Sequence, residues 1–333
     1  MNWSDIDWDA LHRLRRTFLD NPSGSGDYWK SDSDLASYDA TFAQRIGWKW
    51  DYVLSELQRR GWSPPKGELL DWGCGSGIAS RVFLDQFGIE HVTGLNLWDR
   101  SALATTFATR RVREKFPTLV TRAGMIETPA VLLISHVLSE LTPEQTQALA
   151  DSAARAQATI WVEPGTFAAS LTLIAVRERM RGMLKIIAPC THQERCGILA
   201  PGNARHWCHH FATPPPGVFT DGNWSKFANL MGIDLRDLPL SFLALDQRAA
   251  APLPTHATRV LGHPRIYKPH ALLLSCNASG VSEQKLTKRS LPDAFRQLRK
   301  GAFDRLQLMQ SVDKVVAATK PLFANEPGQS QPD

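Results

Sequence analysis

Apolar residues recur at helical spacing through most of the first sixty residues. The first run repeats at Trp8, Leu11, Leu14 and Leu19. A second apolar-periodic run covers about residues 35–58, and a polar stretch with glycine and serine separates the two at 21–27. Two prolines and a glycine within residues 62–67 then stop the second helix. The pattern predicts a helical N-terminal extension over residues 1–62.

From residue 68 the pattern changes to short apolar runs that alternate with helical stretches. The expected strands are residues 68–72, 91–98, 130–135 and 158–163. The expected helices are residues 78–87, 101–115, 143–156 and 166–184. Strands that alternate with helices in this way form a parallel sheet with helices on both faces. We therefore predict an α/β fold with a Rossmann-like core over residues 63–184.

The remainder of the chain is less regular. Residues 185–225 are rich in Cys, His, Pro and Gly, and little regular structure is expected there. The expected short strands are residues 242–246, 259–261, 271–275 and 283–289. Residues 291–318 are expected to be mostly helical, and the polar tail over 325–333 to be disordered. This predicts a Cys-rich, basic, metal-bound region over residues 185–320 that completes the domain, and a disordered tail at 321–333.

Composition narrows the class of protein. Of the 333 residues, 43% are hydrophobic and 21% charged, enough to bury an ordinary core. No window approaches a membrane span, so no membrane partner is expected. The first twenty residues contain four aspartates and no apolar core, unlike a signal or transit peptide. We expect a cytoplasmic protein whose five cysteines are not disulfides.

The net charge of +5 conceals an asymmetry. Residues 1–164 contain 17 Lys and Arg against 21 Asp and Glu, whereas residues 165–320 contain 21 against 10. Such an asymmetry indicates a polyanionic partner for the second half, or simply a basic solvated surface.

A glycine-rich turn follows the first expected strand. It contains Asp71, Gly73, Gly75 and Gly77, followed by a helix. Glycines let the backbone approach a ligand, and the helix presents free N–H groups. The pattern differs from the G-x-G-x-x-G of nicotinamide sites and resembles motif I of class I S-adenosylmethionine-dependent methyltransferases. A turn without a ligand is the alternative.

The resemblance implies a cofactor site. Asp71 would lie near the methionine ammonium, and the three glycines would shape the adenosine-facing turn. Asn96 and Asp99 compete for the acidic position that binds the ribose hydroxyls, and Asp99 is preferred because it is a carboxylate. Ser135, at the end of the third clear strand, is a further candidate for cofactor binding.

The sequence assigns no catalytic residue. After the third strand, base and amide methyltransferases show an [N/D/S]-P-P-[Y/F] loop, but this chain has residues 135–141, Ser-His-Val-Leu-Ser-Glu-Leu. His136 is either a general base or a histidine that packs the loop. Methyl transfer can proceed by positioning alone, so no base is required.

Four cysteines fall in the irregular half of the chain. They are Cys190, Cys196, Cys208 and Cys276, with intervals C-x5-C-x11-C before the last. Zinc sites favour closer thiol pairs, whereas iron–sulfur clusters accept looser spacing. The spacing leaves an iron–sulfur cluster, zinc and buried free thiols open.

An ordered set of sequence blocks resembles the methyltransferase-like family needed to assemble the mitochondrial small ribosomal subunit, which also has bacterial members. The blocks lie at residues 135–141, 163–166, 188–192, 207–211, 242–245 and 265–276. The resemblance implies that the four cysteines bind a [4Fe–4S] cluster. The chain departs from the family pattern at two places. Thr191-His192 stands where the family usually has Pro-His, and the W-C-H-F block has an extra histidine at 209–210; both departures leave the thiols intact.

Basic residues crowd a stretch near the end of the chain. The candidate RNA-binding residues are Lys285, Lys288, Arg289, Arg296, Arg299 and Lys300. A solvated basic face is the alternative. With the resemblance, we expect a small-subunit assembly factor that binds ribosomal RNA or ribosomal particles, S-adenosylmethionine and the cluster; DNA binding is not expected. An active rRNA methyltransferase and a zinc-containing small-molecule methyltransferase are the other hypotheses.

Overall fold

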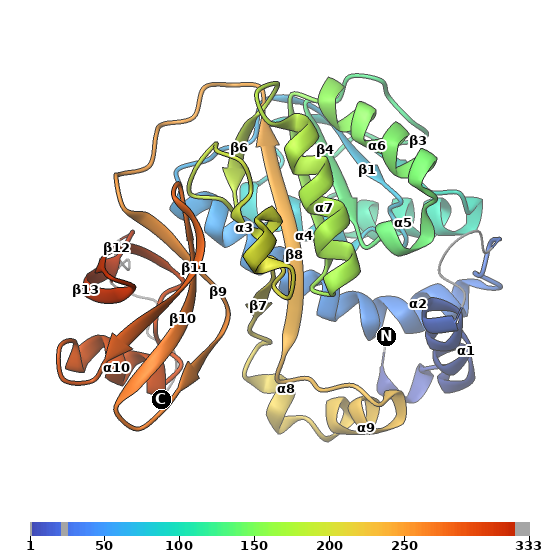
Figure 1. The fold of residues 1–333 in the computed structure, drawn as a ribbon. Helices are drawn as coiled ribbons and strands as arrows, with labels where there is room; N and C mark the ends of the chain where they lie inside the picture. The colour runs from blue at the N-terminus through green and yellow to red at the C-terminus, as the bar shows by residue number, and fades with distance from the viewer. Residues whose placement is uncertain (1, 21–25, 324–333) are drawn as a thin grey trace.

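The computed structural model describes residues 2–20 and 26–323. It contains a helix-covered sheet and, beside it, a small β-barrel formed by the C-terminal part of the chain (Figure 1). The expected disorder of residues 325–333 lies outside the described residues. Within the described residues, no helix has the length and apolar character needed to cross a membrane.

The main sheet has the strand order β3-β2-β1-β4-β5-β8-β6, and β7 pairs with β8. Its strands are β1 (Gly67–Trp72), β2 (Val92–Trp98), β3 (Thr121–Ala123), β4 (Val131–Ser135), β5 (Ala158–Pro164), β6 (Lys185–Ala188), β7 (His210–Ala212) and β8 (Leu238–Asp246). Strands β1 to β5 are parallel, whereas β8 is antiparallel to both β5 and β6. The order reverses direction between β1 and β4, so ligands are expected at the carboxyl ends of these strands.

Helices cover both faces of this sheet. The helices of this part of the chain are α1 (Trp8–Asp20), α2 (Asp32–Ala40), α3 (Phe42–Arg59), α4 (Ile78–Phe87), α5 (Ala102–Lys115), α6 (Pro143–Arg155), α7 (Phe167–Met180), α8 (Gly217–Thr220) and α9 (Gly222–Met231). Buried residues of α3, α4 and α5 form one apolar core with the sheet, and those of α6 and α7 form the second core on the other face. The prediction of an α/β fold with a parallel sheet is confirmed.

The N-terminal helices pack on the α/β core. Leu14 and Leu35, from α1 and α2, share an apolar cluster with Phe107 of α5. Leu11 packs in another cluster with Phe227 of α9. The extension predicted to be helical is therefore built into the core, because its apolar side chains are buried against residues two hundred positions away.

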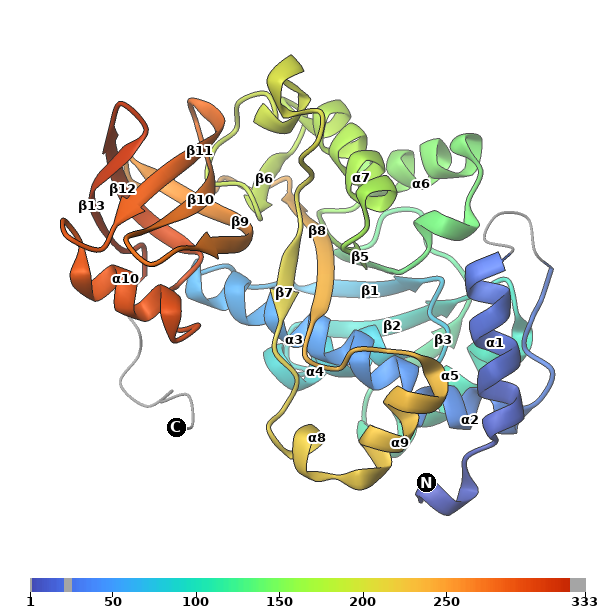
Figure 2. The same ribbon diagram turned by 60° about the horizontal axis from the view of Figure 1, so that its bottom comes forward.

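The C-terminal part forms a closed barrel in the order β10-β11-β13-β12-β9 (Figure 2). Its elements are β9 (Ala257–Ile266), β10 (His270–Asn277), β11 (Gly280–Thr287), α10 (Pro292–Arg299), β12 (Leu306–Val312) and β13 (Val315–Pro321). Phe295 and Leu298 of α10 pack into the barrel core with Met309.

The prediction that residues 291–318 are mostly helical is wrong, because only 292–299 are α-helical there. Lys, Arg, Gln and Ala suggest a helix by propensity, but closing the barrel places residues 306–312 between two partner strands, and tertiary pairing overrides propensity. The short strand β3 was also not predicted.

Candidate functional site

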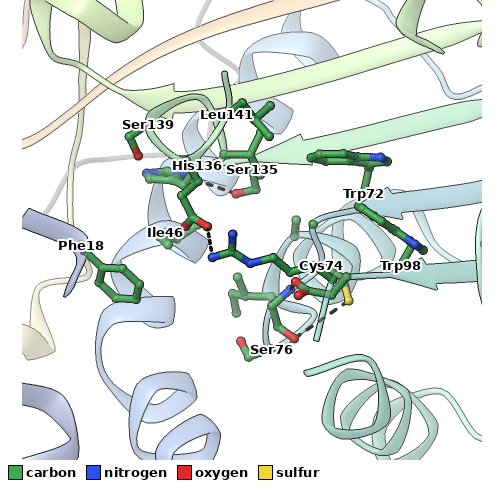
Figure 3. Close-up of a pocket in the computed structure, with 18 of the residues that line it drawn as sticks. Phe18, Ile46, Trp72, Cys74, Ser76, Trp98, Ser135, His136, Ser139 and Leu141 are labelled. Carbon is green, nitrogen blue, oxygen red and sulfur yellow. Dashed lines mark hydrogen bonds and ion pairs between the residues drawn. The ribbon is translucent and has the colours of Figure 1, made fainter. Parts of the chain in front are cut away.

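A cavity of about 580 Å³ lies at the carboxyl ends of β1, β2 and β4. Its floor includes residues of the glycine-rich turn, and the segments that follow β2 and β4 form its sides (Figure 3). Helices α1, α2, α3 and α6 contribute further parts of the wall. The volume lies within the range of small-molecule sites.

The glycine-rich turn leaves its backbone open to this cavity. Gly73, Gly75 and Gly77 have φ of +68°, +51° and +76°, a region that side chains disfavour. A Cβ at Gly73 would come within 2.8 Å of Val137, whereas one at Gly75 would meet no atom within 4 Å. Gly73 and Gly75 line the cavity. Gly77 caps the start of α4 and is not among the lining residues.

Asp99 lines the cavity and Asn96 does not. Asp99 Oδ2 accepts a hydrogen bond from the Gly75 N–H at 2.9 Å, and its Oδ1 accepts from the Ser101 N–H at 2.9 Å. Burial raises its pKa. Asn96 is buried in β2 and donates to Glu68 Oε1 at 3.4 Å. Of the two candidates for the ribose position, Asp99 is the one placed to contact a ligand.

Asp71 lies beneath the turn and is fully buried. Its Oδ2 accepts hydrogen bonds from the hydroxyl and the N–H of Ser80 in α4. Burial raises the pKa of Asp71 to about 6, against the lowering effect of Ser80. Asp71 does not line the cavity. Its Oδ2 contacts fix α4 to the turn, and its Oδ1 is buried without a hydrogen-bond partner among the described residues.

Ser135 and His136 lie where β4 ends, and both line the cavity. The Trp50 Nε1–H donates to Ser135 Oγ at 2.9 Å, and Lys49 Nζ lies 3.2 Å from His136 Nε2. Burial lowers the pKa of Lys49 to about 7 and, with Lys49 nearby, lowers the pKa of His136 well below its ordinary value. The cavity is therefore lined by an imidazole whose pKa is well below its ordinary value and by a lysine whose pKa is about 7. Lys49, in the N-terminal extension, was not predicted as a site residue.

Glu163 is a buried carboxylate behind this loop. Its Oε1 accepts from the backbone N–H groups of Val137 and Leu138, at 3.1 and 3.2 Å, and from Trp161 Nε1 at 2.7 Å. Among the described residues, Oε2 has no hydrogen-bond partner. Burial raises the pKa of Glu163 to about 7.

Changing Glu163 to glutamine should therefore alter how stability depends on pH. The ordinary pKa of a glutamate is near 4.5 and the folded value is about 7, so the folded state binds more protons between them. Stability should thus fall as pH rises through this window, by roughly 3 kcal/mol from this group. The glutamine variant, which keeps all three acceptor contacts through its Oε1, should lose this fall.

Urea unfolding at pH 4.5 and pH 7.5 gives the change in the free energy of unfolding between the two pH values. The effect of Glu163 is the difference in this change between the wild type and the variant. The exposed Glu144, changed to glutamine, is the matched control. Parallel pH curves for wild type and E163Q would contradict the assignment.

Aromatic residues of the N-terminal helices and the segment between them form the outer wall of the cavity. Phe18, Tyr28 and Trp29 line it, and the Tyr28 hydroxyl donates to Glu140 Oε1 at 3.3 Å. Glu140 also pairs with Arg100 at 2.9 Å. The helical spacing of residues 1–60 predicts the helices but carries no signal that they line the same cavity as the glycine-rich turn.

The fold gathers the four candidate metal-binding cysteines from separate segments. Cys196, Cys208 and Cys276 share one apolar cluster with Ile174 of α7. Burial, followed by the proximity of the other three thiols, raises the pKa of Cys208 well above its ordinary value. Cys276 belongs to β10 of the barrel, and Cys190 follows β6 of the sheet. The four thiols therefore lie where the barrel meets the α/β core.

Buried arginines hold the segment that carries Cys190. Arg60 donates to the carbonyls of Ile187, Pro189 and Cys190 at 2.7, 3.0 and 2.9 Å. Arg259 of β9 donates to the Pro189 carbonyl at 2.6 Å and pairs with Glu56, which also pairs with Arg60. These contacts connect α3, the cysteine segment and the barrel.

Arg177 lies beside the thiols with unused hydrogen-bonding capacity. Burial lowers the pKa of Arg177, but the neighbouring Cys190 and Glu178 side chains outweigh this effect, and the pKa is raised. Its Nε and Nη2 are buried and have no partner among the described residues. Within residues 2–20 and 26–323, no group of three or more His, Cys, Asp and Glu side chains is close enough to hold a single metal ion.

The candidate RNA-binding residues all belong to the barrel or its connections, and all are exposed. Lys285 is on β11, Lys288 and Arg289 precede α10, and Arg296 and Arg299 are on that helix, with Lys300 directly after it. Residues 257–321 contain twelve Lys and Arg against four Asp and Glu, a net charge of +8. The charge asymmetry of the sequence is therefore concentrated in this one structural unit.

The main sheet, with its reversal between β1 and β4 and its antiparallel β8, resembles the Rossmann-like sheet of methyltransferases. A model of the family described as mitochondrial small ribosomal subunit Rsm22 matches residues 53–306. The chain belongs to this family, and the resemblance seen in its sequence blocks is confirmed. None of the curated proteins matches the sequence.

Solved structures with partial similarity include methyltransferases. The 16S rRNA methylase ArmA is 16% identical, with a TM-score of 0.33 over 55% of this chain and 91% of that one. Geranyl diphosphate methyltransferase, solved with SAM, is 14% identical, with a TM-score of 0.32 over 73% and 96%. The YcgJ protein of Bacillus subtilis is 10% identical, with a TM-score of 0.35 over 60% and 100%. These values are too low to transfer a ligand or an activity.

Proposed function

We propose that this protein is an assembly factor of the small ribosomal subunit that binds ribosomal RNA, S-adenosylmethionine and a [4Fe–4S] cluster. The observation that carries the proposal is the family match over residues 53–306. The placement of a cavity, four thiols and a basic barrel along one chain supports it. On this account the cofactor and the cluster serve as structural or sensing elements, and RNA is the partner.

The cavity suits S-adenosylmethionine in its chemistry. Asp99 would accept hydrogen bonds from the ribose hydroxyls, and the open backbone of Gly75 would lie against the adenosine. Trp72 and Trp98, with ring centroids 4.8 Å apart, line the same wall and offer aromatic surface. The bound cofactor supplies a methyl group on a positively charged sulfur. Ser135 and His136 would lie across the cavity from the glycine-rich turn.

The four thiols, gathered where the barrel meets the α/β core, would hold the cluster with one thiolate at each iron. A zinc ion held by the same thiols is the alternative. Arg177, with its buried unpaired nitrogens, would face the sulfides and offset the cluster's negative charge.

A second candidate function is an active rRNA methyltransferase. Lys49 and His136, 3.2 Å apart in the cavity, favour it because a neutral nitrogen there could accept a proton from a methylated group. Incubation of small-subunit rRNA with tritiated cofactor, comparing wild type with His136→Ala, separates the two. Incorporation that is lost in the variant establishes the enzyme, whereas ribosome assembly without incorporation supports the assembly factor.

Phosphate contacts should make RNA binding strongly dependent on salt. Changing Lys288, Arg289, Arg299 and Lys300 together to alanine should lower the slope of log K against log salt by up to about 3, because each contact contributes about 0.7. The control changes four exposed basic residues elsewhere, namely Arg16, Lys66, Arg113 and Lys226. Titration with small-subunit rRNA between 50 and 300 mM salt measures both; an unchanged slope excludes the barrel residues.

A further inference from the structure

The barrel has the topology of a known oligonucleotide-binding fold. Strand β9 pairs with β10 and β12, and β11 pairs antiparallel with β10 and parallel with β13. Helix α10 lies between the third and fourth strands of the barrel. Five strands in this closed order, with a helix at that position, define the OB-fold, whose second and third strands and first and last loops form the usual binding surface.

In this barrel the first and last loops lie near one end of the third strand, β11. The loop after β9 covers residues 267–269, and the turn before β13 covers residues 313–314. The Lys288 N–H donates to the Pro269 carbonyl at 2.9 Å, and the Lys285 N–H donates to the Lys314 carbonyl at 2.8 Å. The two loops therefore border the same end of β11.

One aromatic ring, that of Tyr267, is exposed in the first of these loops, and it stacks on the partly exposed ring of His270 at the start of β10. Tyr267 is 47% exposed, and its ring stacks on His270 with centroids 5.0 Å apart and planes 26° apart. The Tyr267 N–H donates to the His270 carbonyl at 2.8 Å, which fixes the turn that presents both rings. Exposed aromatic rings on a fixed turn offer a surface on which unpaired bases can stack.

Positive charge surrounds these rings. Lys268, Lys285, Lys288 and Lys314 are all exposed, and within residues 2–20 and 26–323 none of the four forms a salt bridge, whereas Arg265 is paired with Glu283. The opposite end of β10 and β11 is covered, since Gly197 packs so closely that a Cβ there would lie 2.5 Å from the Val281 nitrogen. The cysteine segment therefore closes one end of the face and leaves the aromatic, basic end open.

We propose that this end of the barrel, formed by residues 267–270, Lys285 and the 313–314 turn, binds unpaired nucleotides of RNA, with bases stacked on Tyr267 and phosphates against the lysines. Paired bases would present only their backbone to the surface, because their faces are already stacked. The inference rests on the proposed function, which identifies the nucleic acid as RNA. It adds that the bound RNA is single-stranded and names the residues that recognise it.

The full-length protein is titrated with a labelled 12-nucleotide single-stranded RNA of mixed sequence, and with the same strand annealed to its complement. The single strand should bind at least about fivefold more tightly. Tyr267→Ala should remove most of this preference, since one stacked base contributes about fivefold or more. Tyr267→Phe, which keeps the ring, should retain it.

A second variant guards against a loss of folding. Asp313 and Lys314 have φ of +49° and +63°, so Lys314→Gly suits the turn while removing the charge. It should keep or raise the unfolding temperature and weaken single-strand binding. Equal affinity for single strand and duplex, unchanged in Y267A, overturns the inference but leaves rRNA binding intact. No binding of either RNA, together with no binding of small-subunit rRNA, overturns both.

Discussion

Changing Cys276 to serine should remove the brown colour of the anaerobically purified protein and most of its iron. The thiol is buried between the barrel and the α/β core, beside the other three cysteines. Serine is a poor ligand for iron in a cluster, so one iron of the cluster would lose its protein ligand. Because a bound group stabilises only the folded state, the unfolding temperature should also fall by roughly 5–10 °C.

Cys74 provides the matched control for this experiment. It is also a buried cysteine, but it lies in the glycine-rich turn, away from the other four. Cys74→Ser should keep the colour and the iron. The assignment fails if the wild-type protein is colourless under anaerobic conditions and carries one equivalent of zinc, or if C276S is as brown as the wild type.

Changing Asp99 to alanine should weaken S-adenosylmethionine binding by about a hundredfold or more. Without the carboxylate, the cofactor would lose two charge-assisted hydrogen bonds to its ribose, each worth about 1.5–3 kcal/mol. The Gly75 N–H would also lose its acceptor, so the turn against the adenosine would be less ordered. Isothermal titration with the cofactor, or with its demethylated product, measures the loss.

Asn96→Ala is the control, because Asn96 lies in β2, three residues before Asp99, but does not line the cavity. Its affinity should stay within about threefold of the wild type. Asp71→Ala should also weaken binding, but together with a lower unfolding temperature, since Asp71 anchors α4 through Ser80. A variant pair in which N96A loses binding and D99A keeps it would reverse the assignment of the ribose position.

The sequence predicts the local features of the site and misses those that depend on distant contacts. The strand, turn and helix around Gly75 were predictable because apolar periodicity and glycine spacing are local properties. The sequence also favoured Asp99 over Asn96, because Asp99 is a carboxylate, but only the structure shows that Asp99 lines the cavity and Asn96 does not. Lys49 gave no signal at all, since only the folding of α3 against β4 places it beside His136.

The barrel was missed for the same physical reason. Its closure depends on a single parallel residue pair, Lys285 with Val315, and on pairing of β12 with a strand some fifty residues earlier. The arginines that hold the Cys190 segment are similarly remote, with Arg259 reaching Glu56 across 203 positions. The resemblance to the family, rather than the spacing of the cysteines, implied a shared site, and the contacts that bring the four thiols together are not local.

The most direct test of the central claim is crosslinking of the protein to ribosomal particles in anaerobic extracts, with the contacted RNA sequenced. The account predicts crosslinks on small-subunit rRNA, carried by residues of the barrel and reduced in the Lys288, Arg289, Arg299 and Lys300 variant. Crosslinks confined to large-subunit rRNA, or none above a control protein of equal charge, would contradict it.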